Sequence, residues 1–122
     1  MFPFGVNYDA GMKAKALLSL LLSVLFLAGC RLSDVRVVEI RAPGVRNEAC
    51  AQRVRQALAQ FRVIDQEKLK FDFATGTVSV TYDSMQLARK NIELAIAQAG
   101  FDANEIPADR AARDALPPEC RP

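Results

Sequence analysis

Segments with the spacing of strands and helices alternate in a fixed order between residues 35 and 103. Strand spacing, with apolar residues at every second position or in a short extended run, occurs in four segments: 35–42, 68–73, 77–82 and 101–103. Helical spacing of apolar residues occurs in two segments, 48–61 and 88–99. The order βαββαβ in about 70 residues predicts an α+β, ferredoxin-like sandwich: a four-stranded antiparallel sheet with both helices on one face.

The residues between these segments suit the turns that the order requires. Asn47 is a good N-cap for the first helix, and Asp83 or Ser84 can cap the second. Gly76 can adopt a positive φ in the loop between the second and third strands, and Gly100 can end the second helix. The first strand therefore starts at one end of the predicted sandwich and leads into the first helix at the other.

The amino-terminal residues have the pattern of a bacterial export signal. A short basic segment that begins at Met12, the expected true start, precedes the apolar run 16–28, which is too short for the roughly 20 residues that span a bilayer. The sequence Leu-Ala-Gly-Cys at 27–30 resembles the lipobox, in which the cysteine sulfur is lipidated and the cysteine becomes the first mature residue. We expect a signal peptide at 1–29, and a lipidated Cys30 with its tether at 30–34.

The lipobox resemblance implies a location in the cell envelope. Cys30 would anchor the chain in membrane lipid, facing the periplasm or another extracytoplasmic surface, with the folded domain close to the bilayer. An aspartate directly after the lipidated cysteine resembles an inner-membrane retention signal of some bacteria. This chain has Arg31 at that position, which favours the outer membrane. Because the first strand starts near Cys30, the anchor and the loop before the first helix are expected at opposite ends of the domain.

The charge and the missing residue types exclude several functions. Without residues 1–29, which contain Lys13, Lys15 and Asp9, 14 basic and 13 acidic residues remain, so no excess of positive charge predicts nucleic-acid binding. The chain has no histidine to act as a base beside a cysteine nucleophile, and no Cys-x-x-Cys pair. We expect no enzymatic activity.

Cys50 lies at the start of the first predicted helix. Unpaired backbone N–H groups and the positive end of the helix dipole favour a thiolate there. With Cys30 lipidated, Cys120 is the second thiol, in a compartment where disulfides form. Three interpretations remain open: a buried apolar cysteine, a thiolate that binds a soft metal with Cys120 or with a second molecule's Cys50, and a Cys50–Cys120 disulfide.

The residues around Cys50 resemble the metal loop of the heavy-metal-associated domain family, which includes copper chaperones, periplasmic mercury-binding proteins and amino-terminal domains of metal-exporting ATPases. That loop reads Gly-Met-x-Cys-x-x-Cys before a helix, and matches are found at Gly44, Cys50, Val54, Ala57 and Leu58. Val45 stands at the methionine position and Asn47 at the first cysteine, while Gly100-Phe101 resembles the closing signature. The resemblance assigns residues 35–103 to this domain and leaves 104–122 as a tail with a short helix at 108–116.

The resemblance also implies a function and its residues. A soft ion such as Cu(I) or Hg(II) would be held between sulfurs, here Cys50 with Cys120. The residues expected around them are Gly44, Val45, Arg46, Asn47 and Phe101. A metal-transport or metal-donor protein is the implied partner. The alternatives are a degenerate, metal-free interaction or structural lipoprotein, and one stabilised by a Cys50–Cys120 disulfide.

Overall fold

The computed structural model describes residues 13–24 and 32–121. Residues 33–122 form one compact unit, and residues 13–24 of the preceding unit are helical. In the described ranges, no helix combines the length and the apolar character needed to cross a membrane. The lipobox with Cys30 and the expected start at Met12 lie outside the described residues, so the lipid anchor and the domain limits stay predictions.

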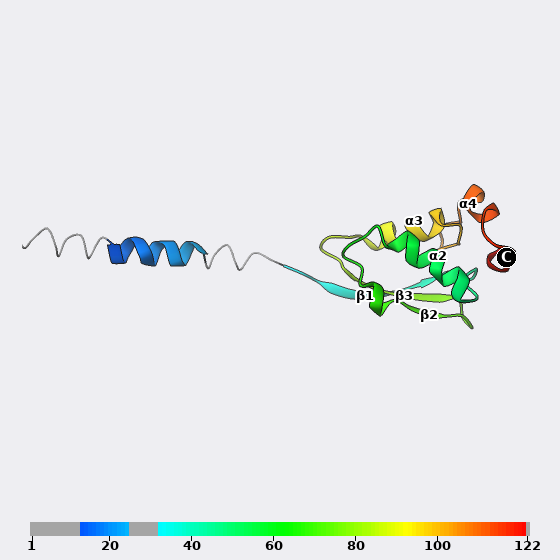
Figure 1. The fold of residues 1–122 in the computed structure, drawn as a ribbon, viewed down its shortest axis with the longest axis horizontal. Helices are drawn as coiled ribbons and strands as arrows, with labels where there is room; N and C mark the ends of the chain where they lie inside the picture. Colours follow the sequence, from blue (N-terminus) through cyan, green and yellow to red (C-terminus); the bar gives the residue numbers. More distant parts are fainter. Residues whose placement is uncertain (1–12, 25–31, 122) are drawn as a thin grey trace, which may run out of the picture. The chain divides into compact units, whose positions relative to one another are not determined.

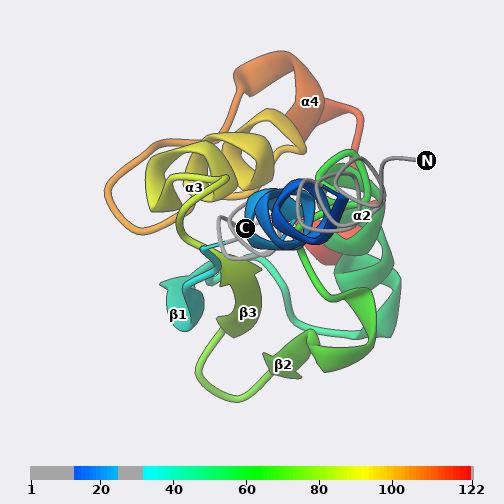
Figure 2. The ribbon, with the colours of Figure 1, turned by 90° about the vertical axis from the view of Figure 1, so that its left-hand side faces the viewer.

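A three-stranded antiparallel sheet forms one layer of the compact unit, with strand order β1-β3-β2. The two longer helices, α2 and α3, cover one face of this sheet (Figures 1 and 2). The elements in chain order are β1 (Val35–Arg41), α2 (Glu48–Leu58), η1 (Gln66–Lys68), β2 (Lys70–Asp72), β3 (Thr77–Asp83), α3 (Arg89–Gln98), α4 (Arg110–Asp114) and η2 (Pro118–Cys120). The prediction of an α+β fold with an antiparallel sheet is confirmed.

The predicted fourth strand, residues 101–103, does not form. The chain comes beside β1 only at one point, where the backbone nitrogen of Asn104 donates to the carbonyl of Arg41 over 2.8 Å and the Asn104 side chain accepts from the Arg41 nitrogen over 2.9 Å. Asn104 has φ 51°, and an isolated bridge between Ala103 and Ile106 closes a turn. This left-handed turn reverses the chain after one contact with β1, so the fourth strand cannot extend.

The helix ends agree with the sequence pattern in two cases and differ in one. Asn47 caps α2 as predicted, and Gly100, at φ 105°, follows the end of α3 as predicted. The Phe101 nitrogen bonds the Ile96 carbonyl there, which completes a Schellman motif with the Gly100 bond to Ala97. The predicted caps of the second helix are wrong, because α3 starts after Ala88 with no side-chain cap.

The remaining predicted elements are found with shorter bounds. The first helix ends at Leu58 rather than at residue 61, and β2 covers 70–72 of the predicted 68–73 because Lys68 ends the 3₁₀ turn η1. The tail helix α4 covers 110–114 of the predicted 108–116, since Asp109 caps its start and Ala115 its end. In each case a local turn with its own hydrogen bonds replaces the end of the predicted element.

The apolar side chains of the strands lie where the alternation places them. Ile40 and Ala42 are fully buried under the helices, together with Val78 and Val80 of β3. The other face of β1 carries Val35, which is 64% exposed. The core is therefore a single layer between the sheet and the helices, as the one-faced pattern predicts.

The two residues that were expected to cap the second helix instead fasten the start of β1 to the end of β3. The Asp83 carboxylate accepts from the backbone nitrogen of Asp34 and from the Gln86 side chain, and Ser84 donates to the Asp34 carboxylate over 2.6 Å. The hydrogen bond from the Asp34 nitrogen is the main cause that lowers the pKa of Asp83. The Ser84 hydroxyl and then Arg36 lower the pKa of Asp34.

This cluster predicts acid sensitivity. Because both carboxyl groups have folded-state pKa values below 3.8, they stabilise the fold above that pH, and the contribution is lost as pH falls through the lowered values. We expect the Asp34→Asn/Asp83→Asn variant to melt at a lower temperature than wild type at pH 7, with the difference shrinking towards pH 2. Thermal unfolding followed by circular dichroism across this range checks it. Asp114→Asn, at an exposed site, is the control, and a difference that is constant with pH would contradict the prediction.

Candidate functional site

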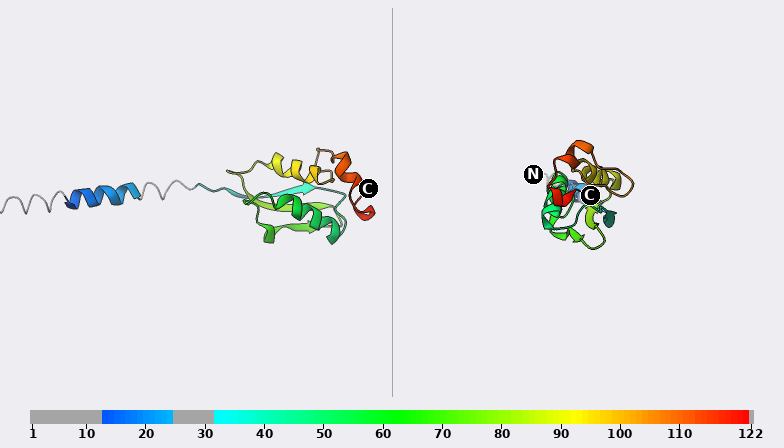
Figure 3. Two further views of the ribbon diagram at one scale, coloured as in Figure 1. Left: turned by 45° about the horizontal axis from the view of Figure 1, so that its top comes forward. Right: turned by 90° about the vertical axis from the view of Figure 1, so that its right-hand side faces the viewer.

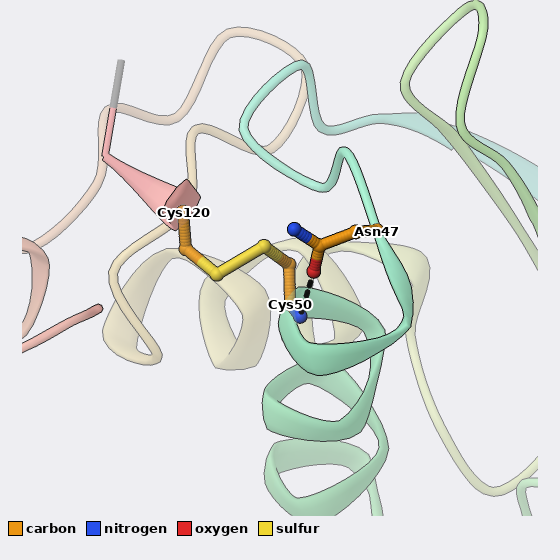
Figure 4. Close-up of a disulfide and its surroundings, with 3 residues drawn as sticks. All are labelled: Asn47, Cys50 and Cys120. Atoms are coloured by element: carbon orange, nitrogen blue, oxygen red, sulfur yellow. Dashed lines mark hydrogen bonds between the residues drawn. A yellow bond between two sulfur atoms is a disulfide. The ribbon is translucent and has the colours of Figure 1, made fainter. Parts of the chain in front are cut away.

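Cys50 and Cys120 form a disulfide, although 70 positions separate them in the sequence (Figure 4). Their Cα atoms are 5.6 Å apart. Cys50 lies in the first turn of α2, and Cys120 is the last residue of η2. The two thiols that the sequence left unassigned therefore meet at one site, in the oxidised state.

The carboxyl-terminal tail packs along the domain before it reaches Cys50. The Asp109 nitrogen donates to the Ala97 carbonyl over 2.8 Å, and Arg113 makes a 2.7 Å ion pair with Asp102. Leu116 is buried, and the Pro117 carbonyl accepts from the Cys120 nitrogen in the closing 3₁₀ turn. Figures 1 and 3 show η2, in red, beside the start of α2. Hydrogen bonds, an ion pair and apolar packing hold the tail against the domain as far as the disulfide.

Both cysteines are buried, and Phe101 and the tail lie close to the loop before α2. Cys50 is 0% exposed and Cys120 1%, and Val45 and Phe101 are each 1% exposed. A Cβ added to Gly44 would lie 3.1 Å from Cδ1 of Phe101 and 3.4 Å from the Cys120 carbonyl oxygen. The prediction that Phe101 neighbours this loop is confirmed, and a side chain at Gly44 would be in tight contact with the Phe101 ring.

The first residues of the loop before α2 contact the turn between β2 and β3. The Gly76 carbonyl accepts from the Ala42 nitrogen over 2.6 Å, and a Cβ on Gly76 would lie only 2.7 Å from the Pro43 Cα. Gly76 has φ 67°, a conformation that favours glycine. This contact confirms that Gly76 is a neighbour of the loop and shows which backbone supports it.

Asn47 acts through its hydrogen bond to the helix start. Its side-chain oxygen accepts from the Cys50 nitrogen over 3.0 Å, which Figure 4 shows as a dashed line. The oxygen is thereby directed at the backbone of α2 as an N-cap. Arg46 beside it is exposed. Of the two positions that hold cysteines in the resembled loop, only that of Cys50 carries a sulfur.

The donor set limits what the site can bind. Within residues 13–24 and 32–121, no group of three or more histidine, cysteine, aspartate or glutamate side chains comes together. The disulfide form has no thiolate to offer. Two-electron reduction, with uptake of two protons, would leave two thiols whose Cα atoms start 5.6 Å apart. Such a pair fits a soft ion of low coordination number and does not fit one that needs several oxygen or nitrogen ligands.

Sequence reasoning did not identify the residues that bring the tail back. Leu116, and the Pro117-Pro118 pair that precedes Cys120, form the last buried contact and the 3₁₀ turn. A proline pair one residue before a cysteine is a signal that could have indicated an ordered turn. The close approach of the Cys120 carbonyl to Gly44 has no counterpart in the sequence pattern.

Comparison with known proteins gives one family and a similar fold. The model of the heavy-metal-associated domain matches residues 39–102, a little more than half of the chain. The crystal structure of oxidized MerP from Ralstonia metallidurans CH34 is similar in fold: TM-score 0.52 and 24% identity over 58% of this chain and 96% of that one. The NMR structure of the ZiaAN sub mutant has TM-score 0.49 and 28% identity, with 59% and 99% covered. A search among curated proteins finds no match.

Proposed function

This chain belongs to the heavy-metal-associated domain family, and we propose that it binds a soft metal ion, Cu(I) or Hg(II) in type, through Cys50 and Cys120 after their disulfide is reduced. The observation that carries the proposal is that both sulfurs occupy one site at the start of α2. The tail thiol would take the role of the sulfur missing at Asn47. Metal binding or trafficking, rather than catalysis, is the activity proposed.

The chemistry follows from the thiol pair. A dithiol reductant would reduce the disulfide with two electrons and two protons, and the dithiol would itself become a disulfide. Binding of the metal ion would then release the two thiol protons, since thiolates are the ligands. Soft ions prefer such sulfur ligands, so the site would discriminate against Mg²⁺ and Ca²⁺. The oxidised form would neither take up nor hold the ion.

The proposal includes a location in the cell envelope. Lipidation of Cys30 would hold the domain at a membrane, facing the periplasm, with the outer membrane favoured. Within the compact unit, β1 runs from Val35 to Arg41, next to the loop that leads to Cys50, so the disulfide lies at the end of β1 away from Val35. A metal donor or acceptor protein would approach this far end.

A second candidate function is supported by the burial of the sulfurs. Both cysteines are at most 1% exposed, which suits a structural disulfide that stays oxidised and closes the fold. In that case the chain would be a metal-free interaction module of the same family. The two candidates differ in whether the reduced protein binds metal.

Competition for Cu(I) between the protein and a chromophoric chelator tests the metal proposal. We expect reduced wild type to take one Cu(I) per chain from the chelator, and Cys50→Ser and Cys120→Ser each to lose more than about 100-fold in affinity, since even removing a group that only supports a ligand costs about 10–100-fold. Ser84→Ala, far from the disulfide, is the matched control. Equal affinity in wild type and in Cys50→Ser would refute the role of the pair and leave the structural function.

A further inference from the structure

Three apolar side chains are exposed at the end of the domain where the chain enters it. Val35 is 64% exposed, Val37 66% and Met85 60%. Val35 and Val37 lie on the sheet face that α2 and α3 leave uncovered, and Met85 follows the end of β3, which pairs with the start of β1. We call these three residues the entry patch.

The apolar character is confined to this end of β1. Further along the same face the side chains are Glu39 and Arg41, and their partners on β3 are Ser79 and Thr77. Charged side chains such as Glu39 and Arg41 are a common protection of an edge strand, and Val35 and Val37 lack it. Exposed apolar residues gathered at one place mark an interaction surface.

The charged groups at this end are paired. Asp34 bonds Arg36 over 2.7 Å, and the Asp83 carboxylate accepts from the nitrogens of Asp34 and Met85, each over 3.0 Å. The side chains of Arg36 and Asp34 are still 65% and 42% exposed, so this pair would stay hydrated among lipid headgroups and would be costly to bury in hydrocarbon. The end is thus compatible with contact at the lipid headgroup boundary.

The length of the tether between Cys30 and Val35 indicates what contacts the entry patch. Four residues separate Cys30 from Val35, a reach of about 15 Å when fully extended. Once Cys30 is lipidated, the start of β1 is held near the bilayer surface, and the entry patch is the closest apolar part of the domain.

We propose that the entry patch rests on the membrane, with Val35, Val37 and Met85 inserted at the headgroup boundary. The inference rests on the lipid anchor of the proposed function and adds an orientation to it. It directs the Cys50–Cys120 end of the domain away from the bilayer, since β1 runs from Val35 to Arg41 and the loop from there leads to Cys50 at the start of α2. Side chains of such surfaces enter about 5–10 Å into the headgroup and acyl boundary.

The absence of tryptophan from the chain permits a direct test. Val37→Trp and Met85→Trp are made singly in the full chain, purified with its lipid from bacterial membranes and placed in phosphatidylcholine vesicles with brominated acyl chains. Leu94→Trp, on α3 in the helical layer and 46% exposed, is the matched control. Circular dichroism confirms folding, and flotation with the vesicles reports the anchor separately.

We expect brominated lipid to reduce the fluorescence of Val37→Trp and Met85→Trp by about twofold and to leave Leu94→Trp unchanged, because bromine quenches only tryptophan at the depth of the boundary. Floating protein in which all three variants are quenched equally, or not at all, overturns the proposed contact and leaves the anchor standing. Protein that does not float overturns the anchor and the inference with it.

Discussion

Loss of the Cys50–Cys120 disulfide is expected to lower the free energy of unfolding of this domain by about 4 kcal/mol. The bond closes a loop across a sequence separation of 70 residues, and the entropy that such a closure removes from the unfolded chain corresponds to that value. A domain of this size has about 5–15 kcal/mol in total, so the bond contributes a large share of the stability. Urea unfolding of residues 33–122 with and without reductant, followed by circular dichroism, measures the difference.

The Cys50→Ser/Cys120→Ser variant separates the covalent bond from the action of the reductant. Its unfolding midpoint should match that of reduced wild type and should not respond to reductant. If oxidised wild type and the variant unfold at the same urea concentration, the bond does not stabilise the fold in the way that its position indicates.

The second large effect is a gain of metal affinity at position 47. Asn47→Cys in a Cys120→Ser background places the introduced thiol one helical turn from Cys50, at the spacing of the family's loop. We expect Cu(I) binding more than about 100-fold tighter than in Cys120→Ser alone, because a second thiolate joins the first and even removing a group that only supports a ligand costs about 10–100-fold. Chelator competition under reducing conditions gives both affinities. The loss of the Asn47 cap should cost about 1 kcal/mol of stability.

Asn47→Ser in the same background is the control, since serine keeps a capping oxygen and adds no thiol. It should bind Cu(I) no better than Cys120→Ser. A failure of Asn47→Cys to gain affinity would mean that the loop of this chain no longer has the geometry that the family uses, although its backbone starts α2 in the expected way.

The main elements of the fold could be predicted because they depend on local patterns. Alternation in β1 and β3 and the helical stripe that includes Ile92 and Ile96 place their apolar residues in the core, as the burial of these side chains confirms. The missing fourth strand could not be predicted, because the left-handed turn at Asn104 and its bonds to Arg41 decide where the chain leaves β1. Such a turn can replace a strand without changing the alternation of apolar and polar residues from which strands are predicted.

The candidate site was predicted only in part. Asn47 as a cap and Phe101 as a neighbour of the loop follow from position and topology, and both are found. The sequence left three alternatives for Cys50, because the path of a tail depends on contacts that are distant in sequence. The ion pair between Arg113 and Asp102 and the packing of Leu116 decide that path.

The roles of the site residues in metal binding stay predictions. Cys50 and Cys120 are placed together by a disulfide, Phe101 and the Cys120 carbonyl lie close to Gly44, Val45 is buried, and Arg46 is exposed. This placement agrees with a pair of cysteines that has two functions. When oxidised, the pair would stabilise the fold as a disulfide, and when reduced, it would bind a metal ion. The same placement agrees with the purely structural alternative, which requires that the disulfide stays oxidised.

X-ray absorption at the copper edge of reduced, Cu(I)-loaded wild type tests most directly whether the two sulfurs form one metal site. We expect two sulfur ligands per copper in a monomer, one sulfur in Cys120→Ser, and no copper retained by the oxidised protein. A spectrum with fewer than two sulfurs in the reduced wild type, or the same copper content in the oxidised form, would contradict it.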